Sequence, residues 1–236
     1  MDKILICTII RNRKKHLDTW LSQIKQIVEH YKDSYLFDLS VYENDSTDGT
    51  KDKLQDLDYS FFNNFNVSTR TLNTKYFGSI VDKQRVINLA AARNNCIYSE
   101  SLDVRDYKKI LFIEPDFTYT LNDAIKIIDT PDCDIISGVS IYKGEFYDRW
   151  ATRKNERETW GNFHIKDSDS VEKVWTTFNG FCLYNAEPFK KNIKFDWYND
   201  RLDHFDCDTA VICENFRRNG YINIVMHNGA KFYHED

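Results

Sequence analysis

Two carboxylates separated by one residue follow an apolar stretch in the middle of the chain. Glu114 and Asp116 flank Pro115 directly after the run from Ile110 to Ile113. Proline lacks the amide hydrogen that a strand needs, so a strand should end there with both acids at its carboxyl end. Carboxylate oxygens suit Mg²⁺ or Mn²⁺, and such an ion shares its other positions with a diphosphate. The pattern predicts a hard-cation site; its alternative is a pair of solvated loop acids.

A second acidic segment runs from Glu43 to Thr50 and carries Asp45 and Asp48. Its Asn, Asp, Ser and Gly residues are typical of a loop. After a parallel strand, such carboxylates can accept hydrogen bonds from ribose hydroxyls or from a base N–H. The alternative is a cluster of Asx turns that caps the next helix, and the residue types favour neither interpretation.

Four further residues could take part in chemistry. Arg93 lies late in a predicted helix, where an arginine more often packs than binds. Asp206 and Asp208 stand where another helix should begin, and the helix dipole stabilises acids there whatever else they do. His234 lies near the end of the sequence, where termini usually fray. None of the four indicates a function by itself.

Alternating strands and helices would position these residues. Continuous β-branched runs predict buried strands, and apolar residues at three- and four-residue spacing predict helices. The expected strands cover 4–10, 35–42, 66–72, 109–113, 133–141, 176–184 and 221–226. The expected helices cover 14–31, 82–98, 122–128 and 208–219, with a short one after Thr50 and a left-handed C-cap at Gly220. This order predicts a doubly wound α/β fold that binds ligands at the carboxyl ends of its strands.

Composition and organisation exclude several classes of protein. With 42% hydrophobic and 15% aromatic residues, the chain is not disordered, and its net charge of −5 argues against nucleic-acid binding. Its apolar runs are too short to span a membrane and no signal peptide is present, so we expect a cytoplasmic protein without membrane insertion. The six scattered cysteines predict reduced thiols. No repeat or linker interrupts the 236 residues, which predicts one domain covering 1–236.

In their order along the chain, these residues resemble a nucleotide-sugar-dependent glycosyltransferase of GT-A fold, in particular the fungal capsule-associated α-1,3-mannosyltransferases. Residues 42–50 are similar to the donor-binding loop, and 92–94 match the family spacing. Residues 114–116 take the place of the DxD motif, with Glu114 replacing the first aspartate. The other similar stretches are 146–148, 151–153, 178–180, 186–189 and 207–221. The resemblance implies a single-domain, Rossmann-like fold with a mostly parallel central sheet and helices on both faces.

The resemblance also implies a site. It implies transfer of a hexose from GDP-mannose or a UDP-sugar to a glycan or other hydroxyl acceptor, with Mn²⁺ or Mg²⁺ held by Asp116, Glu114 and His234. Asp208 would be the acceptor's general base, with Asp206 as its rival. Donor contacts would come from Thr8, Arg11, Glu43, Asp45, Asp48, Arg93, Asn179 and Gly180. A long loop over about 143–175 would lie on the acceptor side, where its aromatic residues could cover the donor, stack on a sugar or simply pack.

Some alternatives stay open at this point. The acid-led helix at Asp208, in which Cys207 replaces the usual glutamate, implies an inverting enzyme, which we favour slightly; the capsule-type mannosyltransferases are regarded as retaining, and Asp208 would then orient a sugar. A sugar-nucleotide pyrophosphorylase has a similar architecture, but 9–13 lack its glycine-rich phosphate loop. A catalytically silent carbohydrate-binding protein would also tolerate the changes at Glu114 and Cys207.

Overall fold

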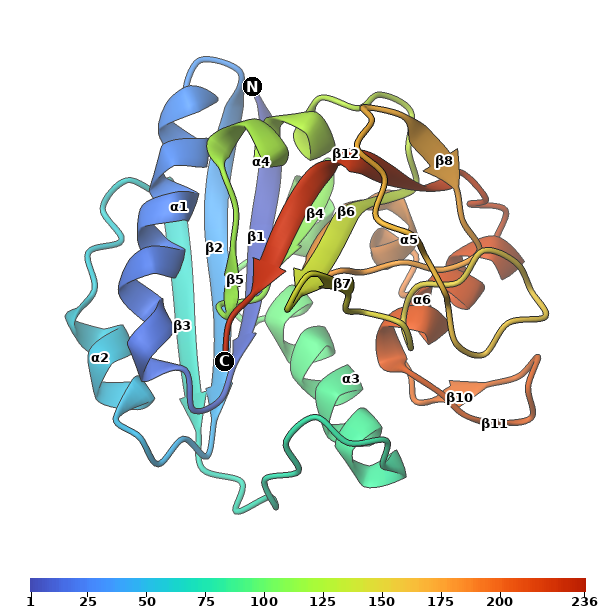
Figure 1. Ribbon diagram of the computed structural model, residues 1–236. Helices are drawn as coiled ribbons and strands as arrows, with labels where there is room; N and C mark the ends of the chain where they lie inside the picture. The colour runs from blue at the N-terminus through green and yellow to red at the C-terminus, as the bar shows by residue number, and fades with distance from the viewer.

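The central layer of the protein is a twisted sheet of ten strands, seen in a computed structural model that describes residues 1–236 (Figure 1). The main strands follow the order β3-β2-β1-β4-β9-β6-β12-β5. Their bounds are β1 Asp2–Ile10, β2 Tyr35–Asn44, β3 Asn64–Arg70, β4 Lys109–Ile113, β5 Phe117–Thr118, β6 Ile135–Tyr142, β9 Phe181–Asn185 and β12 Ile224–His234. Strands β3, β2, β1 and β4 are mutually parallel, β12 is parallel to β6, and β9 runs antiparallel between β4 and β6. The expected mostly parallel α/β sheet is confirmed.

Helices cover both faces of this sheet. Helices α1 (Leu17–His30), α2 (Thr50–Asp56) and α4 (Leu121–Ile128) pack on one face, and α3 (Lys83–Ile97), α5 (Glu187–Lys190) and α6 (Asp208–Arg218) on the other. Strand β1 shows why both faces are covered: Ile4 and Ile6 belong to one core and Leu5 and Cys7 to the other, because successive side chains point to opposite faces. None of the helices combines the length and apolar character needed to span a bilayer.

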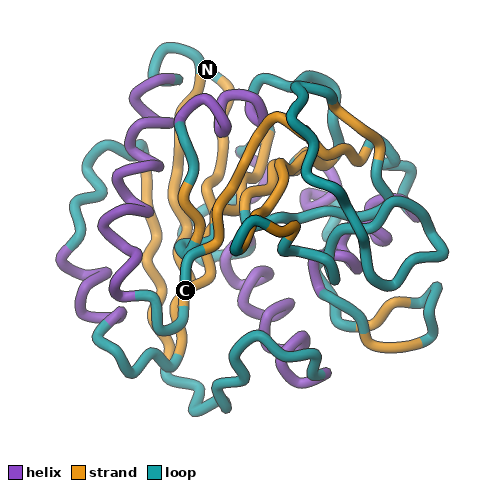
Figure 2. The backbone as a smooth tube through the Cα atoms, in the orientation of Figure 1, coloured by secondary structure: helices purple, strands orange, loops and turns teal.

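Residues 143–175, expected to form a long loop, are mostly irregular (Figure 2). They contain two short antiparallel strands, β7, which pairs with β6, and β8, which pairs with β12, and a separate hairpin follows before α6. These elements are β7 (Glu145–Phe146), β8 (Val171–Lys173), β10 (Tyr198–Asn199) and β11 (His204–Phe205). Single 3₁₀ turns lie at η1 (Lys14–His16) and η2 (Val104–Asp106). All six cysteines are free thiols.

Two strand predictions differ from the structure in an informative way. Strand β9 begins at Phe181 because Asn179 and Gly180 adopt φ values of 57° and 72°, which no strand residue can have. The last strand, predicted to end at Met226, continues past a register shift to His234. The expectation of a frayed end at His234 is therefore wrong: this residue pairs with β5 inside the sheet.

Candidate active site

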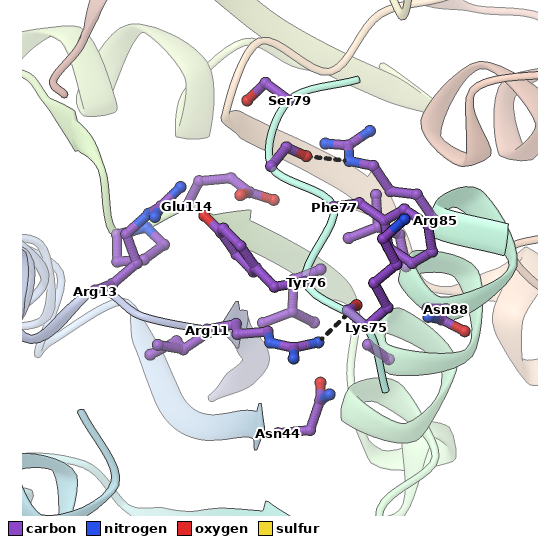
Figure 3. A pocket seen from close by; sticks show the side chains of 16 residues that line it. Arg11, Arg13, Asn44, Lys75, Tyr76, Phe77, Ser79, Arg85, Asn88 and Glu114 are labelled. Carbon is purple, nitrogen blue, oxygen red and sulfur yellow. Dashed lines mark hydrogen bonds between the residues drawn. The ribbon is translucent and has the colours of Figure 1, made fainter. Parts of the chain in front are cut away.

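The carboxyl ends of β1, β2 and β4 open onto a cavity of about 170 Å³ (Figure 3). The segment 75–79 and helix α3 complete its walls. Its polar lining residues are Arg11, Arg13, Asn44, Lys75, Tyr76, Ser79, Arg85, Asn88 and Glu114. The cavity thus offers cationic and amide groups at the strand ends, where open α/β sheets bind ligands.

A second cavity, of about 320 Å³, adjoins the first. The residues that line both cavities are Arg13, Ser79, Arg85, Leu89 and Glu114. The other walls come from residues 147–150, the turn before β9, the start of α6 and the end of β12. Asp116, Asp208 and His234 all line this cavity, although they come from distant parts of the sequence. With Arg93, Glu114 and Gly180, which line the same cavity, the fold brings six of the predicted site residues together.

A buried ion triad forms one wall of the second cavity. Nε of Arg93 donates to Oδ2 of Asp208 and Nη2 donates to Oε1 of Glu114, each over 2.8 Å. The guanidinium carbon also lies 4.3 Å from the ring centre of Phe178. Burial raises the pKa of Glu114 even though Arg93 acts in the opposite direction. Arg93 is thus occupied by two carboxylates, and its Nη1 is the buried nitrogen without a partner.

Asp116 meets both an arginine and the predicted histidine. Nε and Nη2 of Arg13 lie 2.9 and 2.8 Å from Oδ2 of Asp116, and Nε2 of His234 lies 3.5 Å from the same oxygen. Burial alone would raise the pKa of Asp116, but His234 and Arg13 outweigh it and hold that pKa below its ordinary value. The imidazole of His234 stacks on Tyr147 at 4.3 Å. The packing fixes the histidine ring beside the carboxylate.

Asp116 and His234 are of residue types that fit a divalent cation, and they lie side by side. One carboxylate and one imidazole suit Mn²⁺, and Nε2 is the ring nitrogen of His234 that faces Asp116. The other ring nitrogen, Nδ1, is buried without a hydrogen-bond partner. No three His, Cys, Asp or Glu side chains are arranged as a complete metal-binding group. Glu114, the third ligand expected from the sequence, is paired with Arg93 instead. An ion here would need most of its ligands from a diphosphate and water.

The acidic loop after β2 has a mainly structural role in this geometry. Asp45 accepts hydrogen bonds from the backbone N–H groups of Leu72, Asn73 and Thr74. These bonds fix the residues that lead directly into the segment 75–79, which lines the first cavity. Burial raises its pKa, but the hydrogen bonds from Thr74 and its neighbours outweigh this and hold the pKa well below its usual value. Asp48 accepts from the N–H of Thr50 at the start of α2. Neither acid lines either of these two cavities, and both make the contacts that the turn interpretation expects.

Three other expected residues are buried away from both cavities. Thr8 donates to the carbonyl of Ile113 over 2.9 Å, and Glu43 accepts from the N–H of Ser46 over 2.9 Å. Asp206, the expected rival base, accepts from Nη1 of Arg153 over 2.8 Å and also binds the Asn199 amide. Asp206 is therefore buried and helps to hold the residues that lead into α6, whereas Asp208 lines the second cavity.

Of the remaining donor candidates, Arg11 and Gly180 line the cavities and Asn179 does not. Arg11 lines the first cavity, where its guanidinium binds the backbone carbonyl of Thr74 over 2.6 Å. Gly180 lines the second cavity, and a Cβ there would lie 2.3 Å from the ring of Phe117. Asn179 is buried and binds Ser140 Oγ through Oδ1 over 2.7 Å. The turn is therefore a fixed part of the cavity wall.

Sequence reasoning missed a carboxylate that lines the second cavity. Asp148 is half-buried, and its Oδ2 accepts from the backbone N–H of Asn179 over 2.8 Å. Burial raises its pKa to about 6, and the nearby carboxylates Glu114 and Asp208 act in the same direction. It lies in the irregular segment where no periodicity marks a side chain as functional. The only sequence signal for it is its place in the 146–148 stretch.

A match to a protein family model shows to which family the chain belongs. A family model described as Cryptococcal mannosyltransferase 1 matches residues 3–215. The chain belongs to this family. Its resemblance to the capsule-associated mannosyltransferases and its GT-A fold are thereby confirmed. His234 lies beyond the matched residues of the Cryptococcal mannosyltransferase 1 family, so its place beside Asp116 comes from the structure alone. No curated protein sequence matches the chain.

Solved structures show the same fold at low sequence identity. S. aureus TarS 1–349 in complex with UDP is 16% identical with a TM-score of 0.57, and the match covers 98% of this chain and 60% of that one. A Pyrobaculum calidifontis mannosyltransferase, PcManGT, in complex with GDP-Man and Mn²⁺ is 14% identical with a TM-score of 0.56, over 98% and 56%. The chain thus spans about three fifths of the length of these proteins.

Proposed function

We propose that this member of the Cryptococcal mannosyltransferase 1 family transfers a hexose from a nucleotide-diphosphate sugar to a hydroxyl of a glycan, with residues 1–236 acting as one catalytic domain. The observation that carries the proposal is the convergence of Asp116, Asp208 and His234 in a cavity that adjoins a polar cavity at the strand ends. GDP-mannose is favoured over a UDP-sugar as donor by the family match and by the GDP-Man bound to PcManGT.

The two cavities suggest how the donor is oriented. The nucleoside occupies the first cavity, where Arg11 and Asn44 face it, and the sugar enters the second. Arg13 and Arg85 line both cavities, so the diphosphate lies where they meet. Arg85 is held there by a 2.7 Å hydrogen bond from Nε to the carbonyl of Gly78, which leaves the other guanidinium N–H groups for phosphate oxygens (Figure 3).

Asp116 and His234 would hold a divalent cation in this reaction. Such an ion, Mn²⁺ or Mg²⁺, neutralises charge on the departing diphosphate. Arg13, which is bound to Oδ2 of Asp116 and lines both cavities, adds positive charge where the diphosphate would lie. Glu114 does not join them, because it balances Arg93.

Asp148 is better suited than Asp208 to accept the proton of the acceptor hydroxyl. Oδ2 of Asp208 accepts a hydrogen bond from the Arg93 guanidinium over 2.8 Å, so this oxygen is already occupied. Asp148 has one backbone N–H partner and a pKa of about 6, close to the working range of a general base. In an inverting reaction the acceptor O–H bond breaks, its proton passes to Asp148, and the acceptor oxygen bonds to the anomeric carbon. The bond from that carbon to the diphosphate breaks, and the diphosphate leaves with the electron pair.

A thermal-shift screen of the chain with GDP-mannose and UDP-sugars in the presence of Mn²⁺ tests the donor, because a ligand that binds the native state raises its stability. GDP-mannose should give the larger shift, and a response to UDP-sugars alone would refute the mannose assignment. Donor hydrolysis then tests the activity: it should require the cation and should be lost in folded Asp116→Ala. Normal turnover in that variant would refute the site. NMR of the product's anomeric proton distinguishes an inverting reaction from a retaining one. A retaining reaction needs no general base at this position.

A further inference from the structure

Two tryptophans lie together at the second cavity. The rings of Trp150 and Trp160 are stacked, with centroids 5.9 Å apart and planes 11° from parallel. Both residues line the cavity, and neither lines the first. Trp160 keeps 53% of its surface exposed, whereas large aromatic side chains are mostly buried in a core. The pair therefore presents an aromatic surface at the end of the site that is away from the nucleoside cavity.

The backbone around the two rings is closely tied. The N–H of Gly161 donates to the carbonyl of Arg149 over 2.7 Å, and Nη2 of Arg149 donates to Oδ1 of Asn162 over 3.1 Å. Gly161 also approaches the carbonyl of Thr152 so closely that a Cβ would lie 1.8 Å from its oxygen. Because these contacts join the two ends of the tryptophan-bearing segment, the aromatic surface is formed before any ligand binds.

The surroundings indicate which ligand this surface fits. Asp148 and Arg149 line the same cavity and offer a carboxylate and a guanidinium beside the rings. An aromatic face next to charged hydrogen-bonding groups matches a pyranose, which has an apolar C–H face and hydroxyls at its rim. A nucleobase would stack equally well on an aromatic ring, but the polar cavity that suits a nucleoside is lined by neither tryptophan.

We propose that Trp160, supported by Trp150, is the platform on which a pyranose ring of the acceptor glycan stacks. That the stacked pyranose belongs to the acceptor rests on the proposed function, but that a pyranose stacks on Trp160 does not. Placed there, the acceptor reaches the cavity from the side opposite the nucleotide, with a hydroxyl next to Asp148. The acceptor is thereby assigned to the class of carbohydrates rather than to peptides or small alcohols.

Binding without donor tests this proposal. The full chain is titrated separately with mannotriose, xylobiose, chitobiose and GDP, and affinities are measured by calorimetry. At least one oligosaccharide should bind, and Trp160→Ala should weaken it about tenfold or more while GDP affinity stays unchanged. Trp160→Phe should restore part of the loss, because it keeps an aromatic face. Trp197→Ala is the matched control, since Trp197 is a partly exposed tryptophan outside both cavities.

Three other outcomes would overturn the proposal that Trp160 is a stacking platform. These are a wild-type chain that binds no oligosaccharide of the panel, a Trp160→Ala variant that binds as the wild type does, and an equal loss of GDP affinity, which would place the nucleotide at the tryptophans. Failure of the proposed transfer is read separately. If donor hydrolysis is absent but Trp160→Ala still loses oligosaccharide affinity, the platform stands and the transferase activity is refuted.

Discussion

Arg93 joins Asp208 through a 2.8 Å hydrogen bond from Nε to Oδ2, and this contact connects α3 to the first residue of α6. The same guanidinium binds Glu114 at the end of β4. Three elements are therefore fixed to one another at the cavity wall by a single cation, which makes Arg93 a positioning residue rather than a free phosphate ligand.

Replacing Arg93 with Met should destabilise the protein by about 3–5 kcal/mol, because it leaves two carboxylates near each other without their cation. Urea unfolding measures the change. Arg105→Met, which breaks an exposed pair with Asp103, is the control and should have little effect. Equal stability of the two variants would show that the triad does not hold the wall together.

Asp148→Asn should fold normally and lower kcat by about 10²–10⁴, since it removes the group that accepts the acceptor's proton. Glycan and GDP affinities should change little. The control is Asp167→Asn, an exposed acid of the same irregular segment. A retained rate in Asp148→Asn, or a product with retained anomeric configuration, would contradict the assignment of this base.

The transfer rate should rise with pH around a midpoint near 6, because Asp148, whose pKa burial raises to about 6, must lose its proton to act. The free energy of unfolding should change in the direction opposite to the rate as the pH rises. The folded state binds more protons than the unfolded state between the ordinary carboxyl pKa and 6, so the free energy of unfolding falls as pH rises through that window. Asp148→Asn should lack this component. Parallel stability curves for wild type and variant from pH 4 to 6.5 would argue against the raised pKa.

His234→Ala should weaken Mn²⁺ binding in the presence of GDP by about tenfold or more, because it removes one of the two protein ligands that we propose. Electron paramagnetic resonance of free Mn²⁺ measures the affinity directly. His204→Ala serves as the control because His204 is exposed and outside both cavities. Chelation with EDTA should abolish donor hydrolysis in the wild type. Unchanged Mn²⁺ affinity in His234→Ala would remove the histidine from the cation site.

Gly180→Ala should destabilise the protein by more than about 1 kcal/mol, because alanine must adopt a φ of 72° and its Cβ would meet Phe117 at 2.3 Å. Gly144→Ala separates the two causes. Gly144 has a φ of 82° and no atom within 4 Å of a Cβ, so only the backbone strain applies. Equal losses of stability in thermal unfolding would mean that the contact with Phe117 adds nothing.

The sequence predicted best those features that depend on local chemistry. Strand β4 has the predicted bounds because Pro115 ends it, and Gly220 closes α6 with a φ of 87°, as a left-handed C-cap requires. The extension of β12 was missed because the polar residues 227–229 interrupt its apolar pattern at a register shift. The backbone N–H and the side-chain amide nitrogen of Asn228 bind Ser170, which is remote in the sequence, so no local pattern marks this strand.

Site roles were harder to predict because they depend on partners from elsewhere in the chain. Asp206 and Asp208 have the same residue type and local setting, yet one binds Arg153 and the other Arg93. Asp45 and Asp48 have side chains that suit both a turn and a ribose, and only the fold shows that they bind backbone N–H groups. Asp148 lies in a segment without periodicity, so only the family-like stretch 146–148 marks it, and that stretch assigns it no role.

Strand β12, which lies between β6 and β5 and carries His234 at its end, has a consequence for biosynthesis. While a ribosome is still adding residues 224–234, β6 lacks its parallel neighbour and Asp116 lacks its imidazole. The nascent polypeptide can fold around β1 to β4 during this time, but it cannot bring His234 beside Asp116. Chemical competence should therefore appear abruptly, once β12 has left the exit tunnel and inserted between β6 and β5.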